Sequence, residues 1–319
     1  MVFIFIGSSY KDCFILGIPS AGGNQLMTFS LLIAQLINGM QTGSVYALVA
    51  LGYSMVYGII KLLNFAHGDI IMVGAYMTYY AIASFALPPV VAIALAITVS
   101  TLLGVFVEKV AYTPLRSAPR LSLLITAIGV SFLLENGAQL VFGADQKSMD
   151  PLITGSIMLG QINVSFVAIV TILVSVVVMV LLSFVVNKTK AGKAMRAVSE
   201  DMGAAQLMGI SLNRTISMTF AIGSALAGIG SVLYLCAYTQ ASPTMGSMLG
   251  IKAFVAAVLG GIGSIPGAMI GGFTIGILEA LVAAVGLSMW KDAAVFLVLI
   301  IVLLFKPTGF LGKKIQEKV

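Results

Sequence analysis

Residues 163–186 read NVSFVAIVTILVSVVVMVLLSFVV, a stretch of 24 residues without a charged side chain. About 20 apolar residues suffice for a helix to cross a bilayer, so this stretch predicts a membrane-spanning helix. Similar apolar stretches recur at 28–60, 66–87, 89–107, 121–142, 216–238, 251–285 and 292–305. Because lipid cannot satisfy the backbone groups of an open sheet edge, these spans are expected to be helical.

Composition excludes most soluble functions. Of the 319 residues, 60% are hydrophobic and only 9% are charged, whereas about 25% are charged in a typical soluble domain. So few charges cannot cover a water-facing surface, which excludes a soluble enzyme, a nucleic-acid binder and a disordered chain. The sequence predicts an all-α polytopic membrane protein with roughly 8 to 10 transmembrane helices, including broken or re-entrant segments. The stretches 28–60 and 251–285 exceed one simple span, so each is expected to hold a long broken helix or two short ones.

Residue types that perform catalysis are scarce. His67 is the one histidine, and Cys13 and Cys236 are far apart and form no CxxC motif. This scarcity argues against a zinc site and a Ser-His-Asp triad. No GxxxxGK[ST] motif occurs, so any ATP that drives the protein must bind to another chain. We therefore expect neither enzyme activity nor a cofactor in this chain.

The basic residues indicate the orientation. Twelve of the 17 Lys and Arg residues lie in segments 108–120, 187–214 and the tail from 306. The connections 143–162, 239–250 and 286–291 together hold only Lys147 and Lys291. Because lysine and arginine collect on cytoplasmic loops, the first group is expected inside with the C-terminus, and the second outside. Stretch 251–285 must then cross an even number of times, or form a re-entrant hairpin.

The first 26 residues fit this pattern poorly. Their apolar runs are too short to span a bilayer, and no positive segment precedes a longer apolar core as in a signal peptide. We expect Met27 to be the biological start and 1–26 to be an over-long or non-native extension. Residues 27–319 are then a single transmembrane domain that includes the cytoplasmic loop 187–214.

That loop contains a candidate partner-binding helix. Ser199, followed by Glu200 and Asp201, could start a helix with acids in its first turn. A stripe of small and apolar residues follows at helical spacing: Ala204, Ala205, Met208 and Gly209. Such a stripe fits a groove on a partner, and it equally fits a helix that lies back on its own bundle.

Two segments rich in polar residues or glycine interrupt the apolar field. The first, LLNFAHGDIIMVGAY (62–76), contains Asn64, His67, Gly68 and Asp69. The second, VLGGIGSIPGAMIGGF (258–273), contains Gly260, Gly261, Gly263, Gly267, Gly271 and Gly272. Broken helices in two comparable places point to a transport path, whereas glycines at this spacing also permit close helix packing. For His67 we favour a structural role, such as capping a helix end, over proton transfer.

Few ionisable residues lie deep in apolar runs. Glu135 and Glu279 do, and intramembrane acids are functional candidates by default. Lys252 opens a span after an uncharged loop and is expected to snorkel toward the interface. No series of acids and arginines crosses the membrane, which disfavours an ion-coupled secondary carrier.

Four blocks together resemble one family. QLINGMQTGSVYALVALGYSMVYGIIKLLNFAHGDIIMVGAY (35–76) resembles the opening of the permeases of branched-chain amino acid ABC importers, LivH type. AGKAMRAVSEDMGAAQLMGI (191–210) is similar to their cytoplasmic coupling loop, although a strict Glu-Ala-Ala triplet is missing. LGIKAFVAAVLGGIGSIPGAMIGG (249–272) and FKPTGFLGKK (305–314) match the same family.

The resemblance implies a permease subunit of a binding-protein-dependent importer in the bacterial inner membrane. Its implied partners are a second, homologous permease, two cytoplasmic ATPase subunits and a periplasmic substrate-binding protein. The implied cargo is branched-chain or other hydrophobic amino acids, with urea or short-chain amides as the alternative. An ion-coupled carrier remains the second alternative, and an intramembrane enzyme lacks the residues it would need.

The resemblance and the residue patterns together nominate two groups of site residues. Family features of the first motif carry over to Asn64, Phe65, Ala66, His67 and Gly68, and those of the loop to Gly192, Met195, Arg196, Ala197, Ala204, Ala205 and Gly209. Substrate-path candidates are Asn64, His67, Gly68, Glu135, Gly260, Gly261, Gly263 and Gly267. Candidates for coupling to the ATPase are Arg196, Glu200, Ala204, Ala205 and Gly209.

Overall fold

The computed structural model describes residues 29–61, 64–116, 118–160 and 162–312, and the proposed extension 1–26 with its start at Met27 lies outside them. The described helices, in chain order, are α1 (Phe29–Ile60), α2 (His67–Tyr79), α3 (Pro89–Val107), α4 (Arg120–Phe142), α5 (Phe166–Lys188), α6 (Lys190–Glu200), α7 (Met202–Leu207), α8 (Leu212–Tyr238), α9 (Met245–Gly260), α10 (Ile265–Ala284) and α11 (Lys291–Phe305). π-Helical turns η1 (Tyr80–Ser84) and η2 (Glu108–Tyr112) extend α2 and α3, and 3-10 turns η3 (Thr113–Leu115) and η4 (Ser288–Trp290) follow η2 and precede α11.

The predicted all-α membrane architecture is confirmed. Within the described ranges, seven helices are long and apolar enough to cross a bilayer: α1, α3 with its turns, α4, α5, α8, α10 and α11 with η4. Two shorter helices, α2 and the apolar α9, also lie in the bundle. If both also cross, the total is nine, inside the predicted range.

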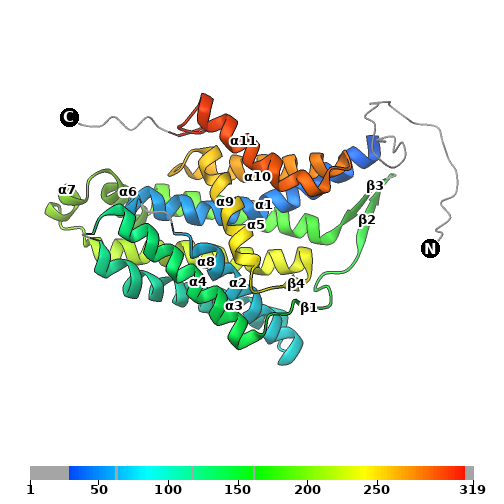
Figure 1. Cartoon of the computed structure of the whole chain (residues 1–319), viewed down its shortest axis with the longest axis horizontal. Helices are drawn as coiled ribbons and strands as arrows, with labels where there is room; N and C mark the ends of the chain where they lie inside the picture. The colour runs from blue at the N-terminus through cyan, green and yellow to red at the C-terminus, as the bar shows by residue number, and fades with distance from the viewer. Residues whose placement is uncertain (1–28, 62–63, 117, 161, 313–319) are drawn as a thin grey trace.

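Two small antiparallel ribbons lie at one end of the bundle. β2 (Ser156–Leu159) pairs with β3 (Ile162–Ser165), and β1 (Lys147–Ser148) pairs with β4 (Gln240–Ala241). Figure 1 shows α6 and α7 at the opposite end of the molecule from the β2–β3 ribbon. The lysine-poor connections and the lysine-rich loop 187–214 therefore lie at opposite ends, as the charge pattern predicts.

The expectation that 28–60 is broken or divided is wrong, because α1 is one continuous helix of 32 residues. Its glycines are contact points instead of breaks. A Cβ at Gly39 would lie 2.9 Å from Ile277 Cα, and one at Gly43 would lie 2.9 Å from Phe273 Cα, both on α10. A glycine costs about 1 kcal/mol within a helix, and here it allows two helices to pack with little side chain between them.

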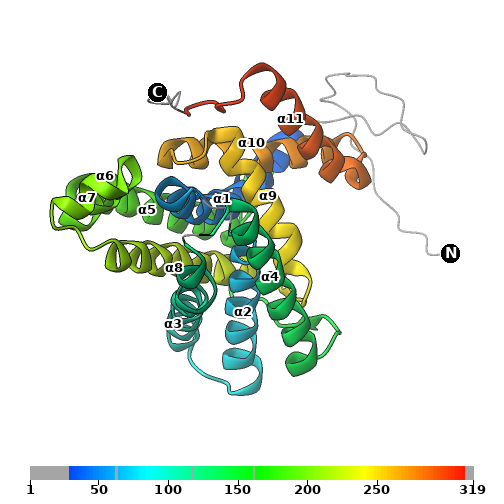
Figure 2. The same ribbon diagram turned by 60° about the vertical axis from the view of Figure 1, so that its left-hand side comes forward.

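The bundle has a buried centre and a lipid-compatible periphery. In α1, 83% of the most apolar window is buried, against 17% in α4 and 6% in α11. Figure 2 shows α1 and α9 between α10 on one side and α2 and α8 on the other. α1, α8 and α9 all contribute core residues to one apolar cluster. The candidate motifs at 64–69 and 258–267 both contact this buried centre.

Stretch 251–285 holds two helices, which confirms that reading of its length. α9 begins earlier than expected, at Met245, and α10 begins at Ile265 after the Ser264 cap, whose Oγ accepts from Gly267 N at 3.2 Å. Pro266 stands in the first turn of α10, where a missing N–H leaves no hydrogen bond unmade. After α11, Phe310 N donates to Leu259 O at 2.9 Å, which returns the chain to the α9–α10 turn.

Candidate functional site

The segment 64–69 forms the buried start of α2. Asn64 is 1% exposed, and its Oδ1 accepts a hydrogen bond from Tyr112 OH at 2.7 Å. The Asn64 carbonyl accepts from His67 N at 3.0 Å, so the turn that precedes α2 is closed locally. Asn64 therefore ties the entry of α2 to the end of α3.

His67 is the first residue of α2 and lies in the protein interior. Its ring contacts Tyr53 edge-on, with 4.9 Å between ring centroids, and it packs against Gly52, both on α1. Its Nε2 has no hydrogen-bond partner among the described side chains and backbone. These contacts agree with a structural role, although the ring fills space between helices instead of capping one at the interface.

Gly68 is where α2 and α9 come closest. A Cβ at Gly68 would lie 3.0 Å from Gly250 Cα and would collide with the Gly246 carbonyl. The reverse also holds, since a Cβ at Gly246 would lie 2.7 Å from Gly68 O. The first turns of the two helices therefore touch through backbone atoms.

The second glycine segment is a tight turn between packed helices. A Cβ at Gly267 would overlap the Gly260 carbonyl oxygen, and one at Gly271 would overlap that of Ala256. Gly261 and Gly263 have φ of 106° and 87°, values that L side chains rarely adopt. Gly263 N donates to Ser54 Oγ on α1 at 2.9 Å. The segment thus packs α9 closely against α10.

Both predicted segments contact the same part of α1. The first segment contacts Gly52 and Tyr53 through His67. The second contacts Ser54, and a Cβ built on its Gly263 would lie 3.7 Å from Gly58 Cα. α1 therefore connects the two motifs over about two helical turns.

Glu135 has partners that its sequence context does not reveal. It lies half-buried on α4, and Ser247 Oγ in the first turn of α9 donates to its Oε2 at 3.1 Å. One turn earlier on α4, Ser131 Oγ donates to Oδ2 of the fully buried Asp69. We call Asp69 and Glu135 the acidic pair. Asp69 was noted in the motif at 62–76, but nothing in the sequence indicated that it would lie with Glu135. The sequence likewise gave no indication that Ser131 and Ser247 would bind these acids.

Lys252 does not snorkel, so that expectation is wrong. It is 7% exposed, and its Nζ lies 2.8 Å from Glu279 Oε1 and 2.7 Å from Asp292 Oδ1. Tyr46 OH on α1 donates to Glu279 Oε2 at 3.0 Å. Snorkelling applies to a lysine with lipid around it, whereas two carboxylates on α10 and α11 neutralise this one inside the bundle.

A second buried acid ties the end of α3 to the start of α8. Glu108 is fully buried and pairs with Arg116, which also donates to Asn213 Oδ1. Ser217 Oγ of α8 donates to Glu108 Oε2 at 2.7 Å. The α8 partners in this network, Asn213 and Ser217, lie at and just beyond the end of the loop that holds the coupling candidates.

The coupling candidates lie on α6, on α7 and, for Gly209, in the link after α7. α6 begins with a Thr189 cap and ends at Glu200, and Asp201 caps α7 by accepting from Ala204 N at 2.9 Å. The expected helix start at Ser199 is therefore wrong by two residues, because Ser199 and Glu200 complete the preceding helix. Asp201, in extended backbone conformation, is the residue that can turn the chain.

Exposure separates these candidates. Arg196, Glu200, Ala204 and Gly209 are exposed, whereas Ala205 is 4% exposed and belongs to the core. Arg196 Nη1 donates to Asn187 Oδ1 at 3.1 Å, next to the end of α5. Leu207 and Met208 are 90% and 82% exposed. α7 therefore presents large apolar side chains outward, while Ala205 seats it on the bundle.

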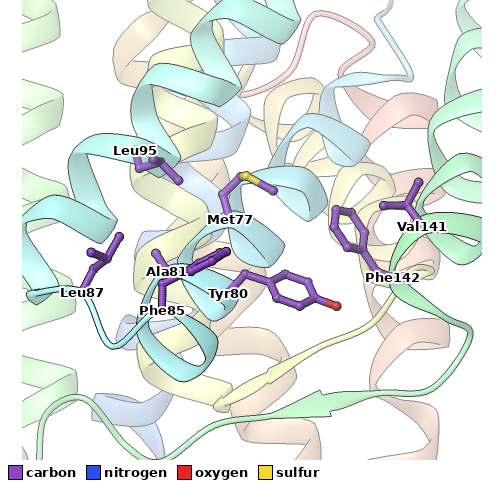
Figure 3. A pocket seen from close by; sticks show the side chains of 8 residues that line it. All are labelled: Met77, Tyr80, Ala81, Phe85, Leu87, Leu95, Val141 and Phe142. Atoms are coloured by element: carbon purple, nitrogen blue, oxygen red, sulfur yellow. The ribbon is translucent and has the colours of Figure 1, made fainter.

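An apolar cavity of about 540 Å³ lies beside the opposite end of α2. Figure 3 shows Met77, Tyr80 and Phe142 around it, with Leu87 and Leu95 contributed by the start of α3 and the loop before it. The Tyr76 ring stacks on Phe142 with 4.4 Å between centroids. The cavity and the acidic pair thus lie along the same two helices, since Met77 follows Asp69 by about two turns of α2 and Val141 follows Glu135 by less than two turns of α4.

Comparison with known proteins gives consistent matches. The family model described as "Branched-chain amino acid transport system / permease component" matches residues 35–304. The high-affinity branched-chain amino acid transport system permease protein BraD of Pseudomonas aeruginosa is 43% identical over 300 residues, which cover 90% of this chain and 98% of that protein. LivH of Escherichia coli K12, with the same description, is 42% identical over 305 residues, 91% of this chain and 99% of LivH.

Among solved structures, PsaBC from Streptococcus pneumoniae in complex with Fab matches with a TM-score of 0.40 and 13% identity. The match covers 85% of this chain and 89% of that chain.

Proposed function

This chain belongs to the family of branched-chain amino acid transport permeases, and from that premise we propose that it translocates branched-chain or other hydrophobic amino acids. It is a multi-pass membrane permease component of an ABC transport system and not itself the ATPase. The observation that carries the substrate proposal is the identity above 40% to BraD and LivH over nearly their whole length. Those matches favour amino acids over urea or short-chain amides, and an ABC system over an ion-coupled carrier.

We propose four partners for the working importer: a second homologous permease, two ATPase subunits and a periplasmic substrate-binding protein. The exposed Leu207 at the end of α7 and the adjacent Met208 support an ATPase contact, because neighbouring large apolar side chains on a solvated surface indicate a partner. Positive charge on the loop 187–214 supports a cytoplasmic position for that end. The same rule supports an inner-membrane protein with a cytoplasmic C-terminus.

In the proposed cycle, the loaded binding protein docks at the end that bears the β2–β3 ribbon. ATP-driven closure of the ATPases moves α7, and Arg196, Glu200, Ala204 and Gly209 lie on the exposed surface that such a partner would meet. Ala205 would transmit the movement, since it is the part of α7 seated in the core. The bundle then changes between two packings, because packed interfaces switch instead of deforming continuously.

We propose Asn64, His67, Gly68 and Glu135 as residues at or next to the substrate path, with the glycines 260, 261, 263 and 267 as its mechanical support. The support for Glu135 is strongest, because it is half-buried and pairs with no basic residue among the described ion pairs. The glycine segment supports the path indirectly, by fixing α9 against α10.

The proposal is tested by affinity purification of the tagged chain from mild detergent, followed by reconstitution with the co-purifying subunits in proteoliposomes. We expect an ATPase and a second permease in the purified complex, and leucine uptake that requires both ATP and loaded binding protein. Uptake by the chain alone, driven by an ion gradient, would overturn the proposal. Uptake of urea but not leucine would overturn the substrate assignment.

A further inference from the structure

The acidic pair lies in the membrane interior, where three helices meet. Asp69 comes from α2, Glu135 from α4, and the hydroxyl groups of Ser131 and Ser247 bind one acid each. Ser131 is the twelfth of the 23 residues of α4, so the cluster lies near the middle of that span. An ionisable residue at this depth is expensive unless it has a function or a partner.

The charge of the pair is only partly balanced. The ion pairs of the described chain involve Glu108, Glu279 and Asp292, and neither Asp69 nor Glu135. Asp69 is the third residue of α2, and Ser247, which binds Glu135, is the third residue of α9. Each helix N-terminus offsets about half a negative charge. With both carboxylates ionised, one in the first turn of α2 and one bound to Ser247 in the first turn of α9, the two termini leave about one negative charge unbalanced.

One oxygen of the pair is also unused. Asp69 is fully buried, and its Oδ1 has no hydrogen-bond partner among the described groups. This atom is directed at the first turn of α9, because a Cβ on Gly246 would lie only 2.8 Å from it. Glu135 reaches the same turn through Ser247. Both acids thus converge on one small region.

Apolar side chains adjoin this region on each of the three helices. One buried apolar group contains a residue close to each part of the cluster. These residues are Met72 near Asp69, Ala138 near Glu135 and Met245 near Ser247, each two or three positions away in sequence. A divalent cation such as Ca²⁺ takes six to eight oxygen ligands, and no group of three metal-binding side chains occurs among the described residues. Two acids beside apolar surface instead match a monovalent ammonium group attached to an aliphatic body.

We propose that the acidic pair is a transient station for the ammonium group of the amino acid during its passage. This inference rests on the proposed function, and it adds the chemical group that the permease itself recognises. Glu135 is half-buried and Asp69 fully buried, so the station opens only when α4 moves away from α2 and α9. Binding is then confined to one state of the cycle, which lets the substrate leave in the other.

The test uses the complete reconstituted importer and isosteric amide variants, Glu135→Gln and Asp69→Asn, which remove charge and keep an oxygen for the serine hydroxyls. We expect amino acid uptake per ATP to fall about tenfold or more, the factor for loss of one charge-assisted hydrogen bond. ATPase stimulation by loaded binding protein should stay within about twofold. The matched control is Asp145→Asn, an exposed acid in the connection 143–162, which should leave both readouts unchanged.

Ser247→Lys provides a second, independent variant. It places a tethered ammonium beside Glu135, restores the missing positive charge and should block uptake while the complex still assembles and hydrolyses ATP. Uptake per ATP at the wild-type level in the amide variants, or in Ser247→Lys, would overturn the proposal. So would proton movement coupled to wild-type uptake and lost in Glu135→Gln, because the missing charge would then be a proton. Failure of the wild-type complex to import amino acids would instead refute the proposed function.

Discussion

Lys252 and Glu279 form an ion pair inside the bundle, with 2.8 Å between Nζ and Oε1 and less than one-tenth of either side chain exposed. The pair joins α9 to α10, and Asp292 extends it to α11. Among the described ion pairs, these are the contacts that hold the least buried spanning helix to the core.

Lys252→Met should destabilise the protein, because it leaves two carboxylates without their cation. Loss of one partner of a buried pair costs about 3–5 kcal/mol, and the partial exposure of Asp292 places the expected value at the lower end. The melting temperature in detergent measures the change. Lys252→Met combined with Glu279→Gln should recover part of the loss, and an equal loss in the single and double variants would contradict the pair.

Gly267→Ala should destabilise the α9–α10 hairpin, since the added methyl group meets the Gly260 carbonyl. Overpacking of this kind costs about 1–3 kcal/mol. Gly137→Ala on α4 is the matched control, because nothing lies within 4 Å of its Cβ position and alanine favours helix. Thermal unfolding of both variants is the measurement, and identical curves would show that the two helices do not pack through Gly267.

Gly209→Val should uncouple ATP hydrolysis from uptake while the complex still assembles. Gly209 has φ of 83°, and a branched residue in this left-handed region must distort the short link from α7 to α8. Nothing lies within 4 Å of its Cβ position, so the effect comes from backbone strain and not from a clash. ATPase and uptake rates are compared in proteoliposomes. Normal uptake would refute the assignment of this loop to coupling.

Leu207→Asp should weaken recovery of the ATPase subunits with the tagged permease and leave its folding intact. Leu207 is 90% exposed, so the folded chain alone loses little packing when it changes. Lys193→Gln on the exposed face of α6 is a control with a comparable change of charge in the same loop. Co-purification at equal permease yield is the measurement. Full recovery of the ATPase with Leu207→Asp would place the contact elsewhere.

The apolar stretches predicted the helical bundle, and the lysine distribution predicted that lysine-rich and lysine-poor connections lie at opposite ends. Both patterns are readable locally because the membrane imposes them on each segment separately. The continuity of α1 escaped prediction, since glycines such as Gly39 and Gly43 read as breaks until α10 is known to lie against them. The site residues stay a prediction, but the contacts of one of them show what the sequence could not supply. Glu135 was nominated by its charge alone, whereas its hydrogen-bond partner Ser247 is 112 residues away in sequence. Ser131 and Asp69, the other bonded pair of the cluster, are 62 residues apart.

Lys252 also shows that local sequence does not reveal partners on distant helices. Its neighbours in sequence are apolar, so its ammonium group was expected to extend toward the aqueous interface. Its two partners lie on later helices, and only the antiparallel return of α10 and α11 brings their carboxylates to it. Pairing with distant carboxylates therefore keeps this lysine buried, although an isolated lysine in an apolar segment would extend to the interface.

The Glu108 network gives the proposed coupling loop a direct connection to the end of α3. Asn213 and Ser217 stand in the first two turns of α8, immediately after α7, and both hold the Glu108–Arg116 pair at the corner that leads into α4. In the proposed cycle, movement of α7 would therefore be passed to that corner through these hydrogen bonds. Since α4 also bears Glu135, the proposed coupling would link α7 to the acidic pair through the start of α8 and the Glu108–Arg116 pair.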